Sequence, residues 1–172
     1  MDSLVTALMN SMAAHHIPNQ AITFIISMIP LLELRGSILV AGAALKLPFI
    51  QTFITAVAGN MLPIPFILLF IEKIFGWMKK SKKLSKFPNW LEAKALKKSD
   101  QIKKYGYFGL YLFVAIPLPG TGAWTGSLLA VLLRLNRKKS LLCIFLGVLT
   151  AGLIMSLVSY GAINGIISLF RH

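Results

Sequence analysis

Four long stretches of this chain contain no Asp, Glu, Lys or Arg, and they constrain its fold more than any other feature. They cover residues 3–32, 47–71, 105–133 and 140–170. Each is longer than the roughly 20 apolar residues that an α-helix needs to cross a hydrocarbon core about 30 Å thick. Hydrophobic residues make up 56% of the 172, which is more than in a typical water-soluble domain. The sequence therefore predicts an all-α integral membrane protein built as a single membrane domain over residues 1–172.

The positive charge of the chain is concentrated in two segments. The net charge is +13, and of the 18 Lys and Arg residues 11 lie between Lys73 and Lys104 and four within residues 134–139. In a water-soluble protein such an excess would suggest nucleic-acid binding. Beside apolar runs it matches the bias that keeps basic loops in the cytoplasm, where they attract anionic lipid headgroups. We therefore expect membrane lipids, and no nucleic acid, as partners.

The apolar run 105–133 is interrupted at its centre by Pro117-Leu-Pro-Gly-Thr-Gly122, which leaves arms of 12 and 11 residues. Neither arm is long enough to cross a membrane. A single crossing would also place the two basic segments on opposite faces, against the charge bias. A re-entrant helical hairpin, which returns to the face it entered from, avoids both problems. Its broken tip must then be buried in protein or line a wet cavity.

The region 17–47 shows the same pattern, because Pro30 and Gly36 interrupt an apolar segment that is followed by Lys46-Leu-Pro48. We predict a second re-entrant hairpin there and true spanning helices over the two remaining runs. The expected order is an N-terminal interfacial helix (1–16), a re-entrant hairpin (17–47), a spanning helix (48–78), a basic cytoplasmic linker (79–104), a re-entrant hairpin (105–133), a basic turn (134–139) and a spanning helix (140–170).

The two predicted hairpins must enter the membrane from opposite faces, because a hairpin returns to its own side and a spanning helix changes sides. This arrangement is an inverted-topology repeat, as in many secondary transporters. Residues 29–39 (IPLLELRGSIL) and 116–129 (IPLPGTGAWTGSLL) agree with it, since both begin Ile-Pro-Leu and both carry Gly-Ser before an aliphatic residue.

Glu33 and Arg35 lie two residues apart near the tip of the first predicted hairpin. A charged side chain at the bilayer centre costs about 2.5–3.5 kcal/mol, so such residues usually face a cavity or each other. We expect a substrate-binding site that includes Glu33, Arg35 and the adjoining Gly36. The alternative is that Glu33 pairs with Arg35 or with the backbone and only holds the hairpin tip closed.

Further candidates for the substrate site come from breaks in the apolar runs and from the basic turn. Asn60 precedes Pro63 and could satisfy backbone groups freed by that break, while Arg134 and Arg137 add positive charge near the cytoplasmic mouth. The second hairpin contributes the residues of its tip: Pro117, Pro119, Gly120, Thr121, Gly122, Trp124 and Thr125. Packing within the fold is the alternative for Asn60 and Trp124.

The linker 79–104 carries helix-forming residues, with Asn89 as the expected N-cap of a membrane-surface helix and Glu92 in its first turn. No nucleotide-binding loop, zinc-protease motif or nucleophile elbow occurs in the sequence. We therefore expect no enzymatic activity, no cofactor and no metal site.

Four segments together resemble a bacterial family named for small multidrug export, which is similar to a branch of the DedA/VTT superfamily of membrane transporters. They are IPLLELRGSI, GNMLPIPFILLF, KYGYFGLYLFVAIPLPGTGAWTGSLLA and LRLNRKKS, and the resemblance covers roughly residues 20–165. It implies paired re-entrant hairpins, a multi-pass protein of the bacterial plasma (inner) membrane, and kinship with lipid translocation and proton-dependent drug resistance. DedA hairpins carry more acidic residues than this chain, in which Glu33 is the one carboxylate predicted within the membrane.

The balance of charge predicts an anionic substrate. Arg35 offsets Glu33, and each returning hairpin arm directs a helix N-terminus, with its partial positive charge, toward the midplane. Together with the superfamily's links to lipid carriers, this favours translocation of a small amphiphile, an anionic lipid phosphate such as undecaprenyl phosphate. Two alternatives stay open: Glu33 exchanges protons for small cationic drugs, or the protein shapes or assembles membranes without transport. A homodimer also stays open.

Overall fold

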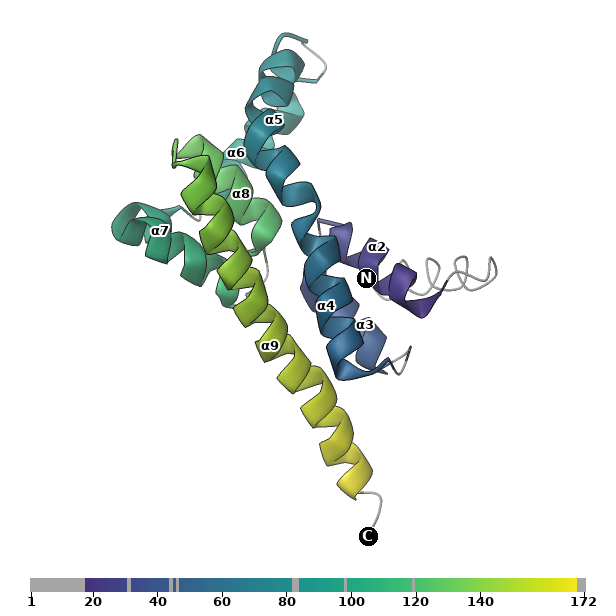
Figure 1. The fold of residues 1–172 in the computed structure, drawn as a ribbon. Helices are drawn as coiled ribbons and strands as arrows, with labels where there is room; N and C mark the ends of the chain where they lie inside the picture. Colours follow the sequence, from purple (N-terminus) through teal and green to yellow (C-terminus); the bar gives the residue numbers. More distant parts are fainter. Residues whose placement is uncertain are drawn as a thin grey trace. The chain divides into compact units, whose positions relative to one another are not determined.

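A computed structural model describes residues 18–30, 32–43, 45, 47–81, 84–97, 99–118 and 120–169. Within these residues every regular element is a helix, which confirms the all-α prediction for the described part of the chain (Figure 1). In chain order the helices are α2 (Asn19–Met28), α3 (Glu33–Ala43), α4 (Phe49–Met61), α5 (Pro63–Lys79), α6 (Lys86–Leu96), α7 (Asp100–Ala115), α8 (Ala123–Leu132) and α9 (Arg137–Leu169). The predicted interfacial helix at 1–16 lies outside the described residues.

Two helices are long and apolar enough to cross a membrane, as judged by length and composition. One is the run Phe49–Lys79, formed by α4 and α5, and the other is Arg137–Gly161 of α9. The helices α4 and α5 meet at Leu62, whose φ of −55° and ψ of −48° are helical. Pro63 and Pro65 have no N–H to donate, so hydrogen bonds are lost at this junction. The first of the two long helices coincides with the predicted span 48–78 to within one residue at each end, and the second covers residues 140–161 of the predicted span 140–170.

The chain divides into two compact units. Unit 1 comprises residues 1–60 and 152–172, and unit 2 comprises residues 61–151. Among the described residues, unit 1 therefore holds α2, α3, nearly all of α4 and the C-terminal part of α9, whereas unit 2 holds α5 to α8 and the N-terminal part of α9. Each unit thus combines a pair of short helices with part of each long apolar helix.

The short pair of unit 1, α2 and α3, occupies the segment predicted as the first hairpin. Helix α2 ends at Met28, and Ile29 is extended at φ −74° and ψ 126° because a following proline disfavours helical geometry. The two helices pack together and are joined by a buried hydrogen bond of 2.6 Å between the hydroxyls of Ser27 and Ser37. The predicted break at Pro30 is present, whereas Gly36, the other predicted interruption, lies inside α3.

The short pair of unit 2, α7 and α8, occupies the segment predicted as the second hairpin. Helix α7 changes direction at Gly106, whose φ of 58° and ψ of −129° are not helical, and this is close to the predicted start of the hairpin at residue 105. After α7 ends, Ile116 is extended at φ −79° and ψ 120° before Pro117. Its geometry is therefore the same as that of Ile29 before Pro30.

The turn between α7 and α8 depends on two glycines and one hydroxyl. Gly120 and Gly122 have φ values of 73° and 128°, a region that glycine adopts readily and residues with a Cβ do not. The Thr121 hydroxyl lies 3.0 Å from the carbonyl of Ile116 and 2.8 Å from that of Leu118, positioned to donate to either. The motif that predicted a hairpin tip is therefore also the motif that closes the turn.

The linker helix begins earlier than predicted. Helix α6 starts at Lys86, so Asn89 lies inside it and is not its N-cap. Pro88 falls in the first turn, where its fixed φ suits a helix and its missing N–H has no intrahelical partner to lose. The Nζ of Lys79, the last residue of α5, lies 2.7 and 2.6 Å from the two carboxylate oxygens of Glu92, so α6 is tied to the end of α5.

Val114 of α7 lies where both α8 and α9 approach that helix closely. A Cβ placed on Gly126 of α8 would lie 2.8 Å from Val114 Cγ2, and one placed on Gly147 of α9 would lie 2.7 Å from Val114 Cβ and 3.0 Å from the carbonyl oxygen of Tyr111. These distances are too short for any side chain. Helices α8 and α9 therefore approach α7 through residues that have no side chain.

Replacing Gly147 with valine should destabilise unit 2, because the new methyl groups collide with backbone and with the base of a rigid side chain. Overpacking of this kind costs about 1–3 kcal/mol. The matched control is Gly76→Val, since nothing lies within 4 Å of a Cβ at Gly76. Denaturant unfolding in detergent, followed by circular dichroism, measures both. Equal stability of the two variants would mean that α7 and α9 do not approach at Gly147.

Candidate functional site

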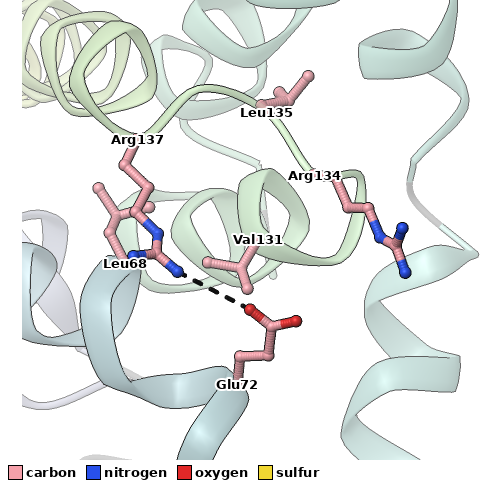
Figure 2. Close-up of a pocket in the computed structure, with 6 residues that line it drawn as sticks. All are labelled: Leu68, Glu72, Val131, Arg134, Leu135 and Arg137. Atoms are coloured by element: carbon pink, nitrogen blue, oxygen red, sulfur yellow. Dashed lines mark ion pairs between the residues drawn. The ribbon is translucent and has the colours of Figure 1, made fainter.

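Unit 2 contains a pocket of about 260 Å³ at the turn between α8 and α9 (Figure 2). Its lining comes from α5, from the end of α8 and from the turn: Leu68, Glu72, Val131, Arg134, Leu135 and Arg137. This volume is slightly below the usual range of ligand pockets, roughly 300–1,000 Å³. Three apolar side chains and three charged ones line the same space, which suits an amphiphilic ligand.

The charged groups of this pocket are two guanidiniums and one carboxylate. Arg137 Nη2 lies 3.8 Å from Glu72 Oε2, and the two side chains are 53% and 70% exposed. An exposed ion pair at this distance contributes about 0–1 kcal/mol, so another anion can replace the Glu72 carboxylate at low cost. Figure 2 shows Arg134 directed away from the Glu72–Arg137 pair, which leaves its guanidinium separate from that ion pair.

The end of helix α8 fixes the backbone at Arg134. The Arg134 N–H donates to the carbonyl of Val131 at 3.0 Å, and the Leu135 N–H donates to that of Ala130 at 2.9 Å. This pair of bonds is a Schellman motif, in which the residue after the C-cap is left-handed and is usually glycine. Here that residue is Arg134, with φ 54°, and a left-handed non-glycine residue carries about 1–3 kcal/mol of strain.

The segment between the two arginines is held by a residue of α7. The Asn136 N–H donates to the Tyr107 hydroxyl at 3.0 Å. The Asn136 side-chain oxygen accepts from the N–H groups of Lys138 and Lys139 at 3.1 and 3.3 Å, which makes Asn136 the N-cap of α9. The start of the spanning helix α9 is thereby fixed relative to α7, immediately after its bend at Gly106.

In unit 1 the predicted charged residues lie at the start of α3. Glu33 has φ 48° and is only 5% exposed, while Arg35 is half-buried in the first turn. The Gly36 N–H donates to the carbonyl of Leu32 at 2.8 Å and so belongs to the helix. In the part of the chain that the structure describes, Glu33 and Arg134 are the two non-glycine residues with positive φ. Backbone strain of this type is concentrated at functional sites.

Asn60 lies just before the junction of α4 and α5 and is 2% exposed. Its Oδ1 has no hydrogen-bond partner among the residues that the structure describes. The groups freed by Pro63 and Pro65 are carbonyls, so this oxygen takes no part in satisfying the break. A buried acceptor without a partner costs about 1–3 kcal/mol, which keeps Asn60 among the candidates for a binding role.

The residues predicted to form the tip of the second hairpin are largely explained by the turn between α7 and α8. Gly120 and Gly122 supply its conformation, and Thr121 bonds within it. Trp124 and Thr125 are half-buried in the first turn of α8, and Pro117 follows the extended Ile116. Pro119 lies outside the described residues.

The predicted site residues therefore fall into two groups. Glu33, Arg35, Gly36 and Asn60 belong to unit 1, and those from Pro117 to Arg137 belong to unit 2. Of the second group, the structure brings Arg134 and Arg137 to one pocket.

Of the six residues that line the unit 2 pocket, only Arg134 and Arg137 were predicted from the sequence; Leu68, Glu72, Val131 and Leu135 were not, nor was the supporting residue Tyr107. Glu72 is the first charged residue after the apolar run 47–71 and lies one helical turn from Leu68, which places both on one face of α5. Its position as an acid beside a strongly basic segment is the sequence signal that could have identified it. Nothing in the sequence distinguishes Tyr107 from the neighbouring aromatic residues.

A comparison with protein-family models shows a match over residues 33–154 to the family described as "Putative small multi-drug export protein". The matched region contains both strained residues, Glu33 and Arg134, and the whole pocket of unit 2. No curated protein and no solved structure matches the chain.

Substitution of Arg134 separates its backbone role from its charge. Glycine accepts φ 54° without steric cost, so Arg134→Gly should leave the free energy of unfolding within about 1 kcal/mol of the parent value. Arg134→Val places a β-branched residue in the left-handed region and should lose about 1–2 kcal/mol. Denaturant unfolding in detergent measures both variants, and valine as stable as glycine would contradict the left-handed turn.

Proposed function

Because the chain belongs to the small multidrug export family, we propose that it is a multi-pass transporter of the bacterial plasma membrane that translocates a small anionic amphiphile. The observation that carries this proposal is the pocket of unit 2, where Arg134 and Arg137 adjoin apolar side chains. Guanidinium groups bind phosphate through paired, charge-assisted hydrogen bonds. The substrate class that suits both parts of the pocket is a lipid phosphate.

The Glu72 carboxylate occupies the place of the substrate anion in this proposal. It is paired with Arg137 at 3.8 Å, and the pocket then retains one excess positive charge. A phosphate group that displaces Glu72 would gain the Arg137 guanidinium as its partner, with the charge of Arg134 at the same pocket, while the hydrocarbon chain of the ligand would lie against Leu68, Val131 and Leu135. A lipophilic cation would meet two like charges, whose repulsion is moderate because both arginines are exposed to water.

We further propose that the two pairs of short helices are re-entrant hairpins in an inverted-topology repeat. Three observations support it. Ile29 and Ile116 end the first helix of each pair in the same extended geometry before a proline. Ser37 and Ser127, which follow the glycine in each Gly-Ser pair, are both fully buried. Each unit also combines one pair with part of each long apolar helix, as expected of repeats in transporters.

The relation to the DedA/VTT superfamily is part of the same proposal, and with it the candidate substrate undecaprenyl phosphate. In this proposal the protein acts without catalysis, cofactor, metal or nucleic acid. The buried Glu33 and half-buried Arg35 belong to the transport pathway in unit 1. Protons are the candidate coupling ion because Glu33 is the buried carboxylate of that unit.

Proton-coupled export of a small cationic drug is the second candidate function. It is favoured by the family's description and by the burial of Glu33, which is 5% exposed. In that mechanism the carboxylates bind the drug and the arginines oppose it. The two candidates therefore predict opposite effects when the charges of the unit 2 pocket are removed one at a time.

The sign of the substrate can be measured with two substitutions in the purified protein. Arg137→Gln should weaken binding of a short-chain polyprenyl phosphate about tenfold to a hundredfold, because it removes charge-assisted hydrogen bonds worth about 1.5–3 kcal/mol. Glu72→Gln should strengthen the same binding, because it removes the competing carboxylate. Isothermal titration in detergent, with ethidium as the cationic ligand, gives both affinities.

The matched control is Lys138→Gln, which removes the same charge from the first turn of α9 at an exposed position outside the pocket lining. It should change neither affinity by more than about twofold, since exposed charges are screened by salt. Loss of ethidium binding in Glu72→Gln, together with unchanged phosphate binding in Arg137→Gln, would favour cation export instead.

A further inference from the structure

Helix α6 of unit 2 presents an aromatic and basic stripe on its exposed face. Phe87, Trp90, Lys94 and Lys97 are spaced by three, four and three residues, so they lie along one side of the helix and its C-cap. Phe87 and Trp90 are 54% and 56% exposed, and both lysines are exposed as well. Large aromatic side chains in such a row are unusual on a surface that faces only water.

The side chains of this stripe are arranged as one surface. The rings of Phe87 and Trp90 have centroids 6.4 Å apart, and Lys94 Nζ lies 4.8 Å from the Trp90 ring centroid. This cation–π contact keeps an ammonium group beside an apolar ring. The combination provides apolar area for insertion and a positive charge at the same depth.

The opposite face of α6 is fixed to the rest of unit 2. Pro88 and Ala95 are buried, and the helix packs against α5 and α8. The bidentate bond from Lys79 neutralises Glu92, the one acidic residue of α6. The exposed stripe therefore carries positive charge without a competing carboxylate, and it is held close to the end of the apolar helix Phe49–Lys79.

We propose that the stripe of α6 docks onto an anionic phospholipid surface, with Phe87 and Trp90 inserted among the headgroups and Lys94 and Lys97 bound to lipid phosphates. Charge complementarity selects this occupant over a second copy of the chain, because two lysine stripes repel each other. Attachment to the end of an apolar helix selects a membrane over nucleic acid, because that helix is itself anchored in a bilayer. Aromatic rings with basic residues are the usual composition of an interfacial helix. This inference is independent of which substrate the protein carries.

Trp90 fluorescence tests the docking in the full-length protein. Trp77→Phe and Trp124→Phe leave Trp90 as the one tryptophan of the three in the chain. The protein is reconstituted into vesicles of phosphatidylcholine alone or of equal parts phosphatidylcholine and phosphatidylglycerol. In the anionic vesicles we expect blue-shifted emission, at least twofold weaker quenching by acrylamide, and stronger quenching by lipids brominated near the headgroup. High salt should reverse part of each change.

Paired substitutions show whether the stripe itself is responsible. Lys94→Gln with Lys97→Gln should return Trp90 to its behaviour in phosphatidylcholine. The matched control is Lys103→Gln with Lys104→Gln, which removes two exposed lysines from the start of α7 and should leave the effect of the anionic lipid in place. Equal loss in both pairs would overturn docking by α6 and indicate a diffuse attraction.

Other outcomes also overturn the proposal. Protection of Trp90 that follows the protein-to-lipid ratio and not the lipid charge would assign the stripe to a second copy of the chain. Protection by an added oligonucleotide, with no response to phosphatidylglycerol, would assign it to nucleic acid. If Trp124→Phe prevents folding, Trp90→Cys in a Cys143→Ser background, labelled with an environment-sensitive dye, gives the same readout with the other tryptophans retained.

Discussion

Backbone hydrogen bonding is the constraint on which the rest of this structure depends, because N–H and C=O groups inside a bilayer must find partners within the protein. Helices satisfy most of these groups, and at each break between helices nearby backbone or side-chain groups have to supply the missing hydrogen bonds. At the first break the Glu33 N–H donates to the carbonyl of Ile29 at 2.8 Å. At the second, two glycines with positive φ and the Thr121 hydroxyl close the turn.

The same constraint explains why the strained residues are charged. Glu33 and Arg134 lie at the ends of helices, where hydrogen bonds to the preceding helix or turn fix a left-handed backbone. A glycine at either position would remove the strain but also the charge. Because the chain carries a glutamate and an arginine there instead, we propose that their charges serve a function that offsets the strain. Of the two strained residues, Arg134 also lines the pocket that contains Arg137.

The breaks were predictable from the sequence because proline and glycine determine local backbone geometry. Pro30 and Pro117 located the ends of α2 and α7 correctly, and the long segments without charged residues located the two long helices. The start of α6 could not be predicted in this way. Asn89 has good capping chemistry, but Pro88 suits a first turn that begins at Lys86. Two local signals of similar strength competed there, and the helix begins at the earlier of the two positions.

The composition of the pocket was only partly predictable. Arg134 and Arg137 were identified by charge. Glu72 lines the same pocket although it lies more than 60 positions away in the sequence, and its place there depends on how α5 packs against α8. The positive φ of Arg134 could not be predicted from residue type, because left-handed positions usually carry glycine or asparagine. Tyr107 was missed because its role is a single hydrogen bond to the backbone of Asn136.

We propose that the two pairs of short helices enter the membrane from opposite faces as re-entrant hairpins, and labelling of their loops tests this directly. Single cysteines at Gln20, Ser81 and Asn136, in a Cys143→Ser background, can be labelled in cells and in inverted vesicles with a membrane-impermeant maleimide. The account predicts that Ser81 and Asn136 react from the cytoplasmic side and Gln20 from the outside. Ser81 and Asn136 on opposite faces would contradict the second hairpin, and with it the inverted repeat.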